Sequence, residues 1–234
     1  MNRPKIICHI LQSVDGNIDG DFFSMPELRP AFQAFARIRE EYACDAVISG
    51  ATTASEIYAN SLAYDLPEAK ETYPRTDGQA AKADKYAVII DVEGTIHWES
   101  GMVERRGDKM HVITILQENI SDAYIAHLRQ AGVSYVFAGK DSLDLPLAVR
   151  KLKEQFGIEK MLLSGGGIVD WAFLQAGLID EISLVIPPVI DGGTGLASAF
   201  DDSVFAANHS SKSLSLIDVQ RLDGDCIWLR YQTI

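Results

Sequence analysis

Three consecutive glycines, Gly165, Gly166 and Gly167, end a short apolar run and precede an apolar helical pattern. Glycine lacks a Cβ, so a ligand can approach its backbone closely. The first turn of a following helix presents unpaired N–H groups and the positive end of the helix dipole. Together with Ser164 and Ile168, the glycines therefore form a candidate site for a phosphate or pyrophosphate. A tight strand-to-helix turn without a ligand explains the same residues equally well.

A second candidate turn is Ser49-Gly50-Ala51-Thr52-Thr53. Small and hydroxyl residues at this place can cap a helix. The N–H and hydroxyl groups of Gly50, Thr52 and Thr53 can also hold a phosphate. Two such turns in one sheet favour the two sides of a dinucleotide cleft. Neither carries G-x-G-x-x-G, which excludes an ordinary Rossmann site.

The segment Asp15–Asp21 resembles the first half of a calcium-binding loop. Such a loop needs a glutamate at its twelfth position, and here that position is Pro26. We therefore expect no metal and interpret the segment as a glycine-rich turn that leaves the first strand. In an α/β sheet, a turn at the carboxyl end of a strand borders the ligand crevice, and we expect this turn to lie there.

Two carboxylates, Asp15 and Glu27, are the candidate catalytic groups. Glu27 lies just ahead of a helical pattern, where a negative charge can interact with the helix dipole. It can equally face a substrate ring as a proton source. The five histidines show no metal-ligand spacing, and His9 lies in a predicted strand as an expected core residue. No G-x-S-x-G motif supports a serine hydrolase.

Apolar, β-rich runs alternate with helical patterns along the chain, which predicts an α/β fold with a largely parallel sheet flanked by helices. The expected strands are 6–11, 46–48, 86–90, 111–116, 135–137, 161–163 and 181–186, and the expected helices cover 28–42, 125–131, 147–156 and 169–176. Residues 213–220 and 226–231 flank an Asp-Gly pair and predict a C-terminal antiparallel hairpin that completes a mixed sheet.

The composition is that of a soluble globular protein of 234 residues, with 21 basic and 33 acidic residues and a net charge of −12. This charge disfavours nucleic acid and anionic lipid as partners. Three scattered cysteines fit a reducing cytoplasm. We find no signal peptide and no apolar run long enough to span a membrane. We therefore expect a cytoplasmic protein that acts on a small molecule.

Residues 60–84 are polar, contain Pro67, Pro74 and Gly78, and lack periodicity. They predict one long loop within a single domain of residues 1–234. Two tyrosines of this loop, Tyr64 and Tyr73, suggest a lid that closes over a substrate. A simple surface loop is the alternative.

The motifs, in their order along the chain, resemble a known family. They are Ser13-x-Asp15-Gly16-x-Ile18, Asp45–Thr53, Gly165–Gly167, Ala176-Gly177-Leu178-Ile179-Asp180-Glu181 and Asp191-Gly192-Gly193. This set resembles the reductase domain of bacterial riboflavin biosynthesis, the C-terminal part of the bifunctional deaminase/reductase, which has a dihydrofolate-reductase-like fold. The resemblance covers the chain from about Lys5 to Tyr231.

The resemblance implies a homodimeric, NADPH-dependent reductase that converts the ribosylamino group of a phosphorylated pyrimidine into ribitylamino. It places the glycine turn against the cofactor pyrophosphate and makes Thr53 a cofactor contact. It places Gly16 and Ile18 near the nicotinamide. It also implies a cis peptide bond between Gly165 and Gly166, by analogy with the fold.

The chain departs from the family at groups that hold the sugar phosphate. Ile57 replaces an aspartate, Ser164 replaces a glutamate, and no arginine occurs in 58–65. These losses favour a different small heterocycle as the substrate. They also leave two alternatives open, which are a nucleotide-binding protein without turnover and a folate or pterin reductase.

The choice of cofactor also has an alternative. Asp91 and Glu93 follow the strand 86–90, at a turn that in this fold tends to approach the adenosine 2′-phosphate. Two carboxylates would repel that phosphate. NADPH is the expected cofactor, and NADH is the alternative.

Overall fold

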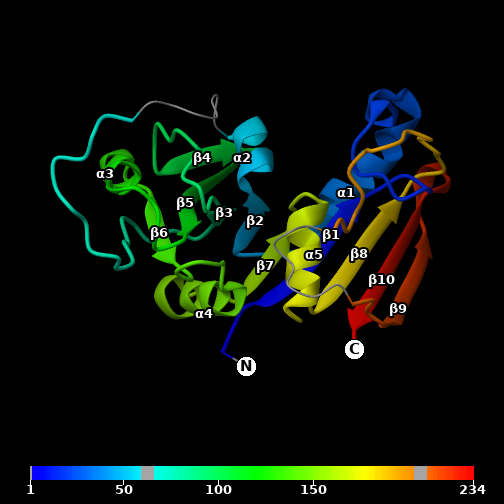
Figure 1. Cartoon of the computed structure of the whole chain (residues 1–234). Coiled ribbons are helices and arrows are strands. Elements are labelled where there is room, and N and C mark those ends of the chain that lie inside the picture. Colours follow the sequence, from blue (N-terminus) through cyan, green and yellow to red (C-terminus); the bar gives the residue numbers. More distant parts are fainter. Residues whose placement is uncertain (1, 59–65, 203–209) are drawn as a thin grey trace. The chain divides into compact units, whose positions relative to one another are not determined.

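The computed structural model describes residues 2–58, 66–202 and 210–234. The chain divides into two compact units, coloured by sequence in Figure 1. The first contains Met1–Pro4 and Asp45–Glu159, and the second contains Lys5–Cys44 and Lys160–Ile234. Each unit combines strands with helices. The expectation of a single domain stays a prediction.

The first unit is built on a short mixed sheet. Its elements are β2 (Ala46–Gly50), α2 (Ala51–Ile57), β3 (Tyr86–Ile90), β4 (Met102–Arg105), β5 (Asp108–Leu116), α3 (Asp122–Ala131), β6 (Ser134–Phe137) and α4 (Leu145–Phe156). The strand order is β4-β5-β3-β2, and β6 also pairs with β5. All neighbours are parallel except β4 and β5. Parallel neighbours explain why β3 and β5 are nearly continuous apolar runs, as strands covered on both faces are.

Local sequence signals set the limits of α3 and α4. The side chain of Ser121 accepts a hydrogen bond from Tyr124 N, and that of Asp144 accepts one from Leu147 N. These contacts satisfy N–H groups that the first helical turn leaves without partners. Gly132 ends α3 in the left-handed region, where glycine carries no Cβ penalty. The helices therefore begin and end where their capping residues lie.

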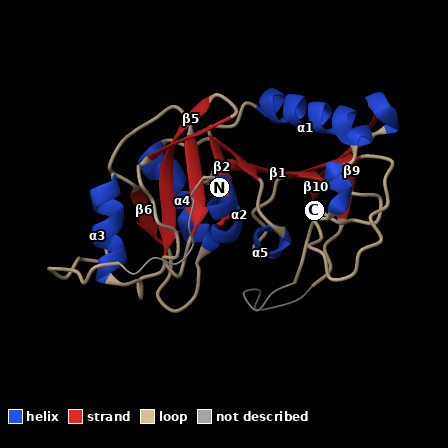
Figure 2. Ribbon diagram, turned by 90° about the horizontal axis from the view of Figure 1, so that it is seen from above, coloured by secondary structure: helices blue, strands red, loops and turns tan. Residues whose placement is uncertain are grey.

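The second unit contains the strands that follow and precede the glycine turn. Its elements are β1 (Lys5–Leu11), the 3-10 turns η1 (Asp21–Ser24) and η2 (Pro26–Leu28), α1 (Arg29–Tyr42), β7 (Lys160–Leu163), α5 (Gly167–Gln175), β8 (Glu181–Ile186), β9 (Leu214–Arg221), η3 (Asp223–Asp225) and β10 (Ile227–Thr233). The order is β7-β1-β8-β10-β9. The first three strands are parallel, and β10 is antiparallel to both neighbours. Figure 2 shows α1 on one face of this sheet and α5 on the other.

The predicted α/β fold with a mostly parallel mixed sheet and a C-terminal hairpin is confirmed. Each expected strand and helix is present, with ends that move by a few residues. The strand β4 was not predicted. Its residues alternate between exposed and half-buried positions, so it carries no apolar run. At the hairpin, the Asp-Gly pair lies in η3, and Gly224 has a φ of 70°.

His9 is a core residue that links β1, α1 and β8. Its ring stacks on Phe35 with a centroid distance of 4.2 Å. Nε2 donates to the Phe35 carbonyl at 3.0 Å, so Nδ1 accepts from Ser183 Oγ at 2.9 Å. Ser183 in turn accepts from the indole of Trp228. In the neutral imidazole, this network gives both ring nitrogens a hydrogen-bond partner.

The described part of the predicted long loop, residues 66–84, has no helix or strand. It is nevertheless fixed to its own unit. Arg75 hydrogen-bonds Tyr73 O, Glu118 O, Ile120 O and the Asp122 carboxylate. We call residues 73–80 the strap. Tyr64, half of the proposed lid, lies outside the described residues.

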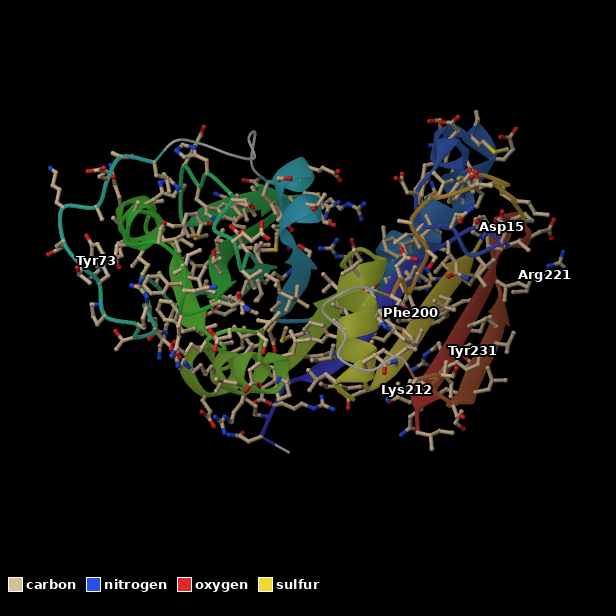
Figure 3. The ribbon with its side chains drawn as sticks, viewed as in Figure 1. Asp15, Tyr73, Phe200, Lys212, Arg221 and Tyr231 are labelled. Carbon is tan, nitrogen blue, oxygen red and sulfur yellow. The ribbon has the colours of Figure 1, made fainter. Side chains whose placement is uncertain are left out.

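Tyr73 does not lie free above a site. It packs against the core cluster of α3 and β6, and the guanidinium of Arg129 lies 5.1 Å from its ring centroid. Figure 3 labels it on the loop of the first unit. Gly78 forms an antiparallel bridge with Tyr135 of β6. The strap is therefore a packed part of the first unit.

Among the residues that the structure describes, none of the helices combines the length and the apolar character that a membrane crossing requires.

The neutral His9 predicts a specific pH dependence of stability. Burial lowers the pKa of His9 from 6.5 to about 4. The unfolded chain takes up this proton near pH 6.5 and the native protein does not, so the stabilisation is present above pH 6.5 and is lost as the pH falls to about 4. We expect the free energy of unfolding to fall by up to about 3 kcal/mol across this range from His9 alone.

The measurement is urea unfolding at several pH values for the wild type and His9→Gln. Gln keeps a donor and an acceptor but does not titrate here, so the difference between the two proteins should shrink as the pH falls. An unchanged difference from pH 7 to pH 4 would contradict the assignment.

Candidate active site

In the second unit, the carboxyl ends of β1, β7 and β8 lead into loops that contact one another. The loop after β1 donates from Val14 N to Val189 O and from Ile18 N to Ala197 O. Ala199 N donates back to Gly16 O. The two loops thus form a short irregular ladder. Ligands of α/β proteins bind at this edge of a parallel sheet.

Asp15 fixes these two loops by its carboxylate. One oxygen accepts from Ser13 Oγ at 2.5 Å and from Asp191 N at 3.1 Å. The other accepts from Gly192 N at 2.8 Å. Figure 3 labels Asp15 at this end of the unit. The group is exposed, yet both oxygens are used within the protein.

The hydrogen bond from Ser13, followed by those from Gly192 and Asp191, lowers the pKa of Asp15 to about 2. At neutral pH the group is therefore an ionised acceptor and not a proton donor. A catalytic role for Asp15 stays a prediction. As an ionised acceptor, Asp15 can orient the two loops or a hydrogen-bond donor of a substrate.

The glycine turn leads from β7 into α5, as the sequence predicted. The third glycine of this turn is needed for close packing within the protein. A Cβ on Gly167 would lie 2.2 Å from the carbonyl oxygen of Ser198 and 2.6 Å from Oδ2 of Asp201. Asp201 N also donates to Gly167 O, and the Asp201 carboxylate accepts from Ser198 N and Oγ. The loop 198–201 is therefore packed directly on the first turn of α5.

The first two glycines differ in a way that matters for binding. A Cβ on Gly165 would lie 2.9 Å from Cβ of Val169, so this position is also filled from within. Gly166 has an ordinary φ of −69° and ψ of 165°, and no atom of the described residues lies within 4 Å of its added Cβ. Every other glycine described in this unit has either a positive φ or a close neighbour. Among the described glycines of this unit, Gly166 is therefore the position that leaves room for close approach by a ligand. We call this open space the cradle.

The first turn of α5 presents unused donors beside that space. Gly166 O accepts from Val169 N and Asp170 N, which begins the helix. Within the described residues of this unit, no group accepts from the N–H of Gly167 or Ile168. The side chain of Ile168 is 46% exposed and follows directly. An anionic group with an apolar neighbour fits this arrangement.

The predicted cis bond is wrong. The described peptide bonds are all trans, the Gly165–Gly166 bond among them. The extended backbone of Gly166, the N-cap of α5, already turns the chain from strand to helix. Ser164 is half-buried beside the turn, and its role as a cofactor contact stays a prediction.

Glu27, the other predicted carboxylate, is exposed in η2, ahead of α1. It is an acidic residue in the first turn of that element, with Pro26 at its start. This position fits the interpretation as a helix charge. A catalytic part for Glu27 stays a prediction.

The second predicted turn lies in the first unit. Gly50 is the N-cap of α2, and since it has no side chain, the turn's hydroxyl groups do not cap this helix. Thr52 is exposed and Thr53 is half-buried in its first turn. Their cofactor contacts stay predictions, as do those of Gly16 and Ile18 in the second unit.

Asp91, one of the two carboxylates expected to repel the 2′-phosphate, is buried in its own unit. Asp91 is 1% exposed, and its carboxylate accepts from Thr95 N, Thr95 Oγ1, Ile96 N and Tyr124 Oη. These hydrogen bonds close the turn after β3, and their donors all belong to the first unit. Glu93 alone is exposed at this turn. The choice between NADPH and NADH stays a prediction.

The loop 198–201 and its contact with α5 were not predicted. Ser198 and Asp201 are polar residues in an irregular segment, and no spacing marks them. The only sequence signal was Gly167 itself, because three glycines exceed what a turn alone needs. The contact is a property of the folded unit.

An α/β fold with an open glycine cradle at the carboxyl ends of parallel strands defines a class of proteins that bind anionic ligands at that edge. The comparison with known families is more specific. Residues 4–228 match the model described as the RibD C-terminal domain. The chain belongs to this family, and this membership supports a reductase role and thus an oxidoreductase.

A curated relative is the 2,5-diamino-6-ribosylamino-4(3H)-pyrimidinone 5′-phosphate reductase of Methanothermobacter thermautotrophicus. It is 27% identical over 205 residues, which cover 85% of this chain and 84% of that protein. Among solved structures, a pyrimidine reductase-like protein of Corynebacterium diphtheriae has a TM-score of 0.69 at 18% identity, covering 100% of this chain and 93% of that one. The riboflavin biosynthesis reductase of Saccharomyces cerevisiae has a TM-score of 0.60 at 14% identity, with 100% and 91% covered. The two structures show the fold.

Substitutions at two adjacent glycines should separate folding from binding. Gly167→Ala forces a Cβ against Ser198 O, and overpacking of this kind costs about 1–3 kcal/mol. Gly166→Ala meets nothing, and its φ and ψ suit alanine. Its gain in unfolded-state entropy and its poorer N-cap offset each other, so we expect a change within about 1 kcal/mol.

Denaturant unfolding of both variants checks this expectation. Equal losses of stability in the two variants would show that Gly166 is also required by the fold.

Proposed function

We propose that this protein is an NADPH-dependent reductase that acts on a phosphorylated ribosylaminopyrimidine or a closely related small heterocycle in the cytoplasm. The open cradle at Gly166 is the observation that carries the proposal. Family membership gives the reaction class, and the cradle gives this chain a place for the cofactor diphosphate. When bound, NADPH supplies the hydride.

The residues of the second unit fit a diphosphate by backbone chemistry. The chain has a net charge of −12, so its general field repels an anion. The N–H groups of Gly167 and Ile168 and the dipole of α5 supply local attraction without a basic side chain. Gly166 lets the diphosphate approach, and Ile168 offers an apolar contact.

The substrate assignment rests on the curated relative, whose name states a ribosylated pyrimidine phosphate. Ile57 and Ser164 stand where the family has carboxylates, so this chain holds its substrate by a different set of groups. For that reason we keep a related heterocycle within the proposal. Glu27 is the proposed proton donor or anchor, and Asp15 the acceptor that orients the loops.

Titration of the purified chain with NADPH and, separately, with NADH tests the cofactor. We expect NADPH to bind more tightly. Gly166→Asp should weaken that binding at least about tenfold, because a carboxylate enters the cradle, and tenfold corresponds to about 1.4 kcal/mol. Ser215→Asp, which adds the same charge on the exposed strand β9, should leave the affinity unchanged.

The reaction is followed by loss of NADPH absorbance with three substrates: the diaminopyrimidinone of the relative, 5-amino-6-(5-phosphoribosylamino)uracil, and dihydrofolate. Turnover with either pyrimidine supports the proposal. Turnover with dihydrofolate alone would make this a folate reductase. Binding of NADPH without turnover would favour a nucleotide-binding protein, and no binding of either nucleotide would overturn the reductase.

We further propose that the protein is a homodimer, as the family resemblance implies. Strand register places Leu216, Val219, Ile227 and Leu229 on one face of β9 and β10. Leu216 and Val219 are 56% and 53% exposed. A contiguous apolar face of this kind marks an interaction surface, and a second copy is the occupant that we propose. Figure 3 labels Arg221 and Tyr231 at the two ends of this face.

Sedimentation velocity tests the dimer. Leu216→Glu places a charge in the proposed interface and should convert a dimer into a monomer. Ser215→Glu adds the same charge to the opposite face of β9 and should leave the dimer intact. A monomeric wild type, or equal behaviour of the two variants, would contradict the proposal.

A further inference from the structure

Asp170 is a fully buried acid in the first turns of α5, with an exposed fraction of 0%. Carboxylates are almost never fully buried unless they are paired. Asp170 is packed towards β1, where the thiol of Cys8, also fully buried, is its neighbour. The proposed reductase chemistry gives this group no part. Its burial therefore calls for a physical reason.

Neither oxygen of Asp170 has a hydrogen-bond partner among the described residues. The Cys8 thiol and the Gly165 N–H act on the carboxyl group from nearby, yet neither closes a bond of normal geometry. Burial raises the pKa of Asp170 well above its usual range. Ionising a fully buried carboxyl group that has no hydrogen-bond partner is costly, so this environment favours the uncharged acid.

Asp170 lies directly against the glycine turn. Its Oδ1 is 3.3 Å from the position that a Cβ on Gly165 would take. Its N–H donates to Gly166 O at 3.2 Å, so the residue touches the turn by both backbone and side chain. Among the described residues, Cys8 on β1 is the titratable group that acts on Asp170, and Asp201 lies against Gly167 at the start of the same helix.

The state of this acid matters for an anion at the same turn. An ionised Asp170 would place a negative charge within the first turns of α5, in a region of low dielectric constant, where charges interact strongly. It would offset the positive helix end that a diphosphate needs. An uncharged Asp170 fills the same space and leaves that end positive.

We propose that Asp170 is a positioning residue, which supports the glycine turn as an uncharged acid and thereby keeps the positive end of α5 available to the diphosphate of the dinucleotide. This inference rests on the proposed function. It adds a second requirement to the site. The glycine turn needs a neutral side chain at Asp170 as well as the open space at Gly166.

Infrared difference spectroscopy on the full chain tests the proposal. At pH 7.5, the wild type minus Asp170→Asn should show the carbonyl stretch of a protonated carboxylic acid. Addition of NADPH should shift this band, because the phosphates arrive beside it. Asp223→Asn, which removes an exposed acid of the hairpin, should leave the band and its shift in place.

Affinity gives a second measurement. Asp170→Ala removes the support and should weaken NADPH binding about tenfold, or about 1.4 kcal/mol. Asp170→Asn has the shape of the neutral acid and should bind NADPH within about twofold of the wild type. An ionised carboxylate at pH 7.5, a band that NADPH does not move, or an Asn variant as weak as the Ala variant would each overturn the inference. A wild type that binds neither nucleotide would instead remove the proposed function, whatever the band shows.

Discussion

Both oxygens of the Asp15 carboxylate accept hydrogen bonds from the loop after β8, and the rest of the second unit's edge depends on that attachment. The attachment holds the loop 187–201 along the loop after β1. The far end of the same loop then reaches α5, where Ser198 and Asp201 lie against Gly167. The carboxylate of Asp15, which the sequence suggested as a catalytic group, thus holds the backbone of the loop after β8. The glycine turn has its shape because neighbouring loops are fixed around it.

The three glycines of the turn have different surroundings. Gly165 and Gly167 make room for the protein's own atoms, and Gly166 leaves a space that none of the described residues of its unit fills. The electrostatics follow the same division. The titratable side chains that contact the turn are those of Asp170 and Asp201, so in our proposal the attraction for an anion comes from backbone N–H groups and from the dipole of α5. An acidic protein can bind an anion in this way only where its own carboxylates are neutral or already hydrogen-bonded.

The sequence was sufficient for the strands and helices because their signals are local. Short apolar runs predicted β1, β3 and β8. The caps Ser121 and Asp144 were not recognised, so the predicted starts of α3 and α4 fell at 125 and 147, a few residues late. The exposed strand β4 lacks an apolar run and was missed. At the site, the glycine turn was predicted, whereas the loop 198–201 was not. The burial of Asp91 and Asp170 was also beyond prediction, because burial depends on residues far away in the chain and no spacing encodes it.

The strap has a consequence for how the chain reaches its fold. Gly78 bridges to Tyr135 on β6, and it must be glycine because a Cβ would lie 2.5 Å from the tyrosine ring. Exposed strand edges recruit other chains, and proteins protect them by covering the edge. The strap precedes β6 in the sequence, so during synthesis it leaves the ribosome first. The cover for this edge is thus already present when the strand that needs it emerges, which shortens the time in which β6 can pair with a neighbouring nascent chain.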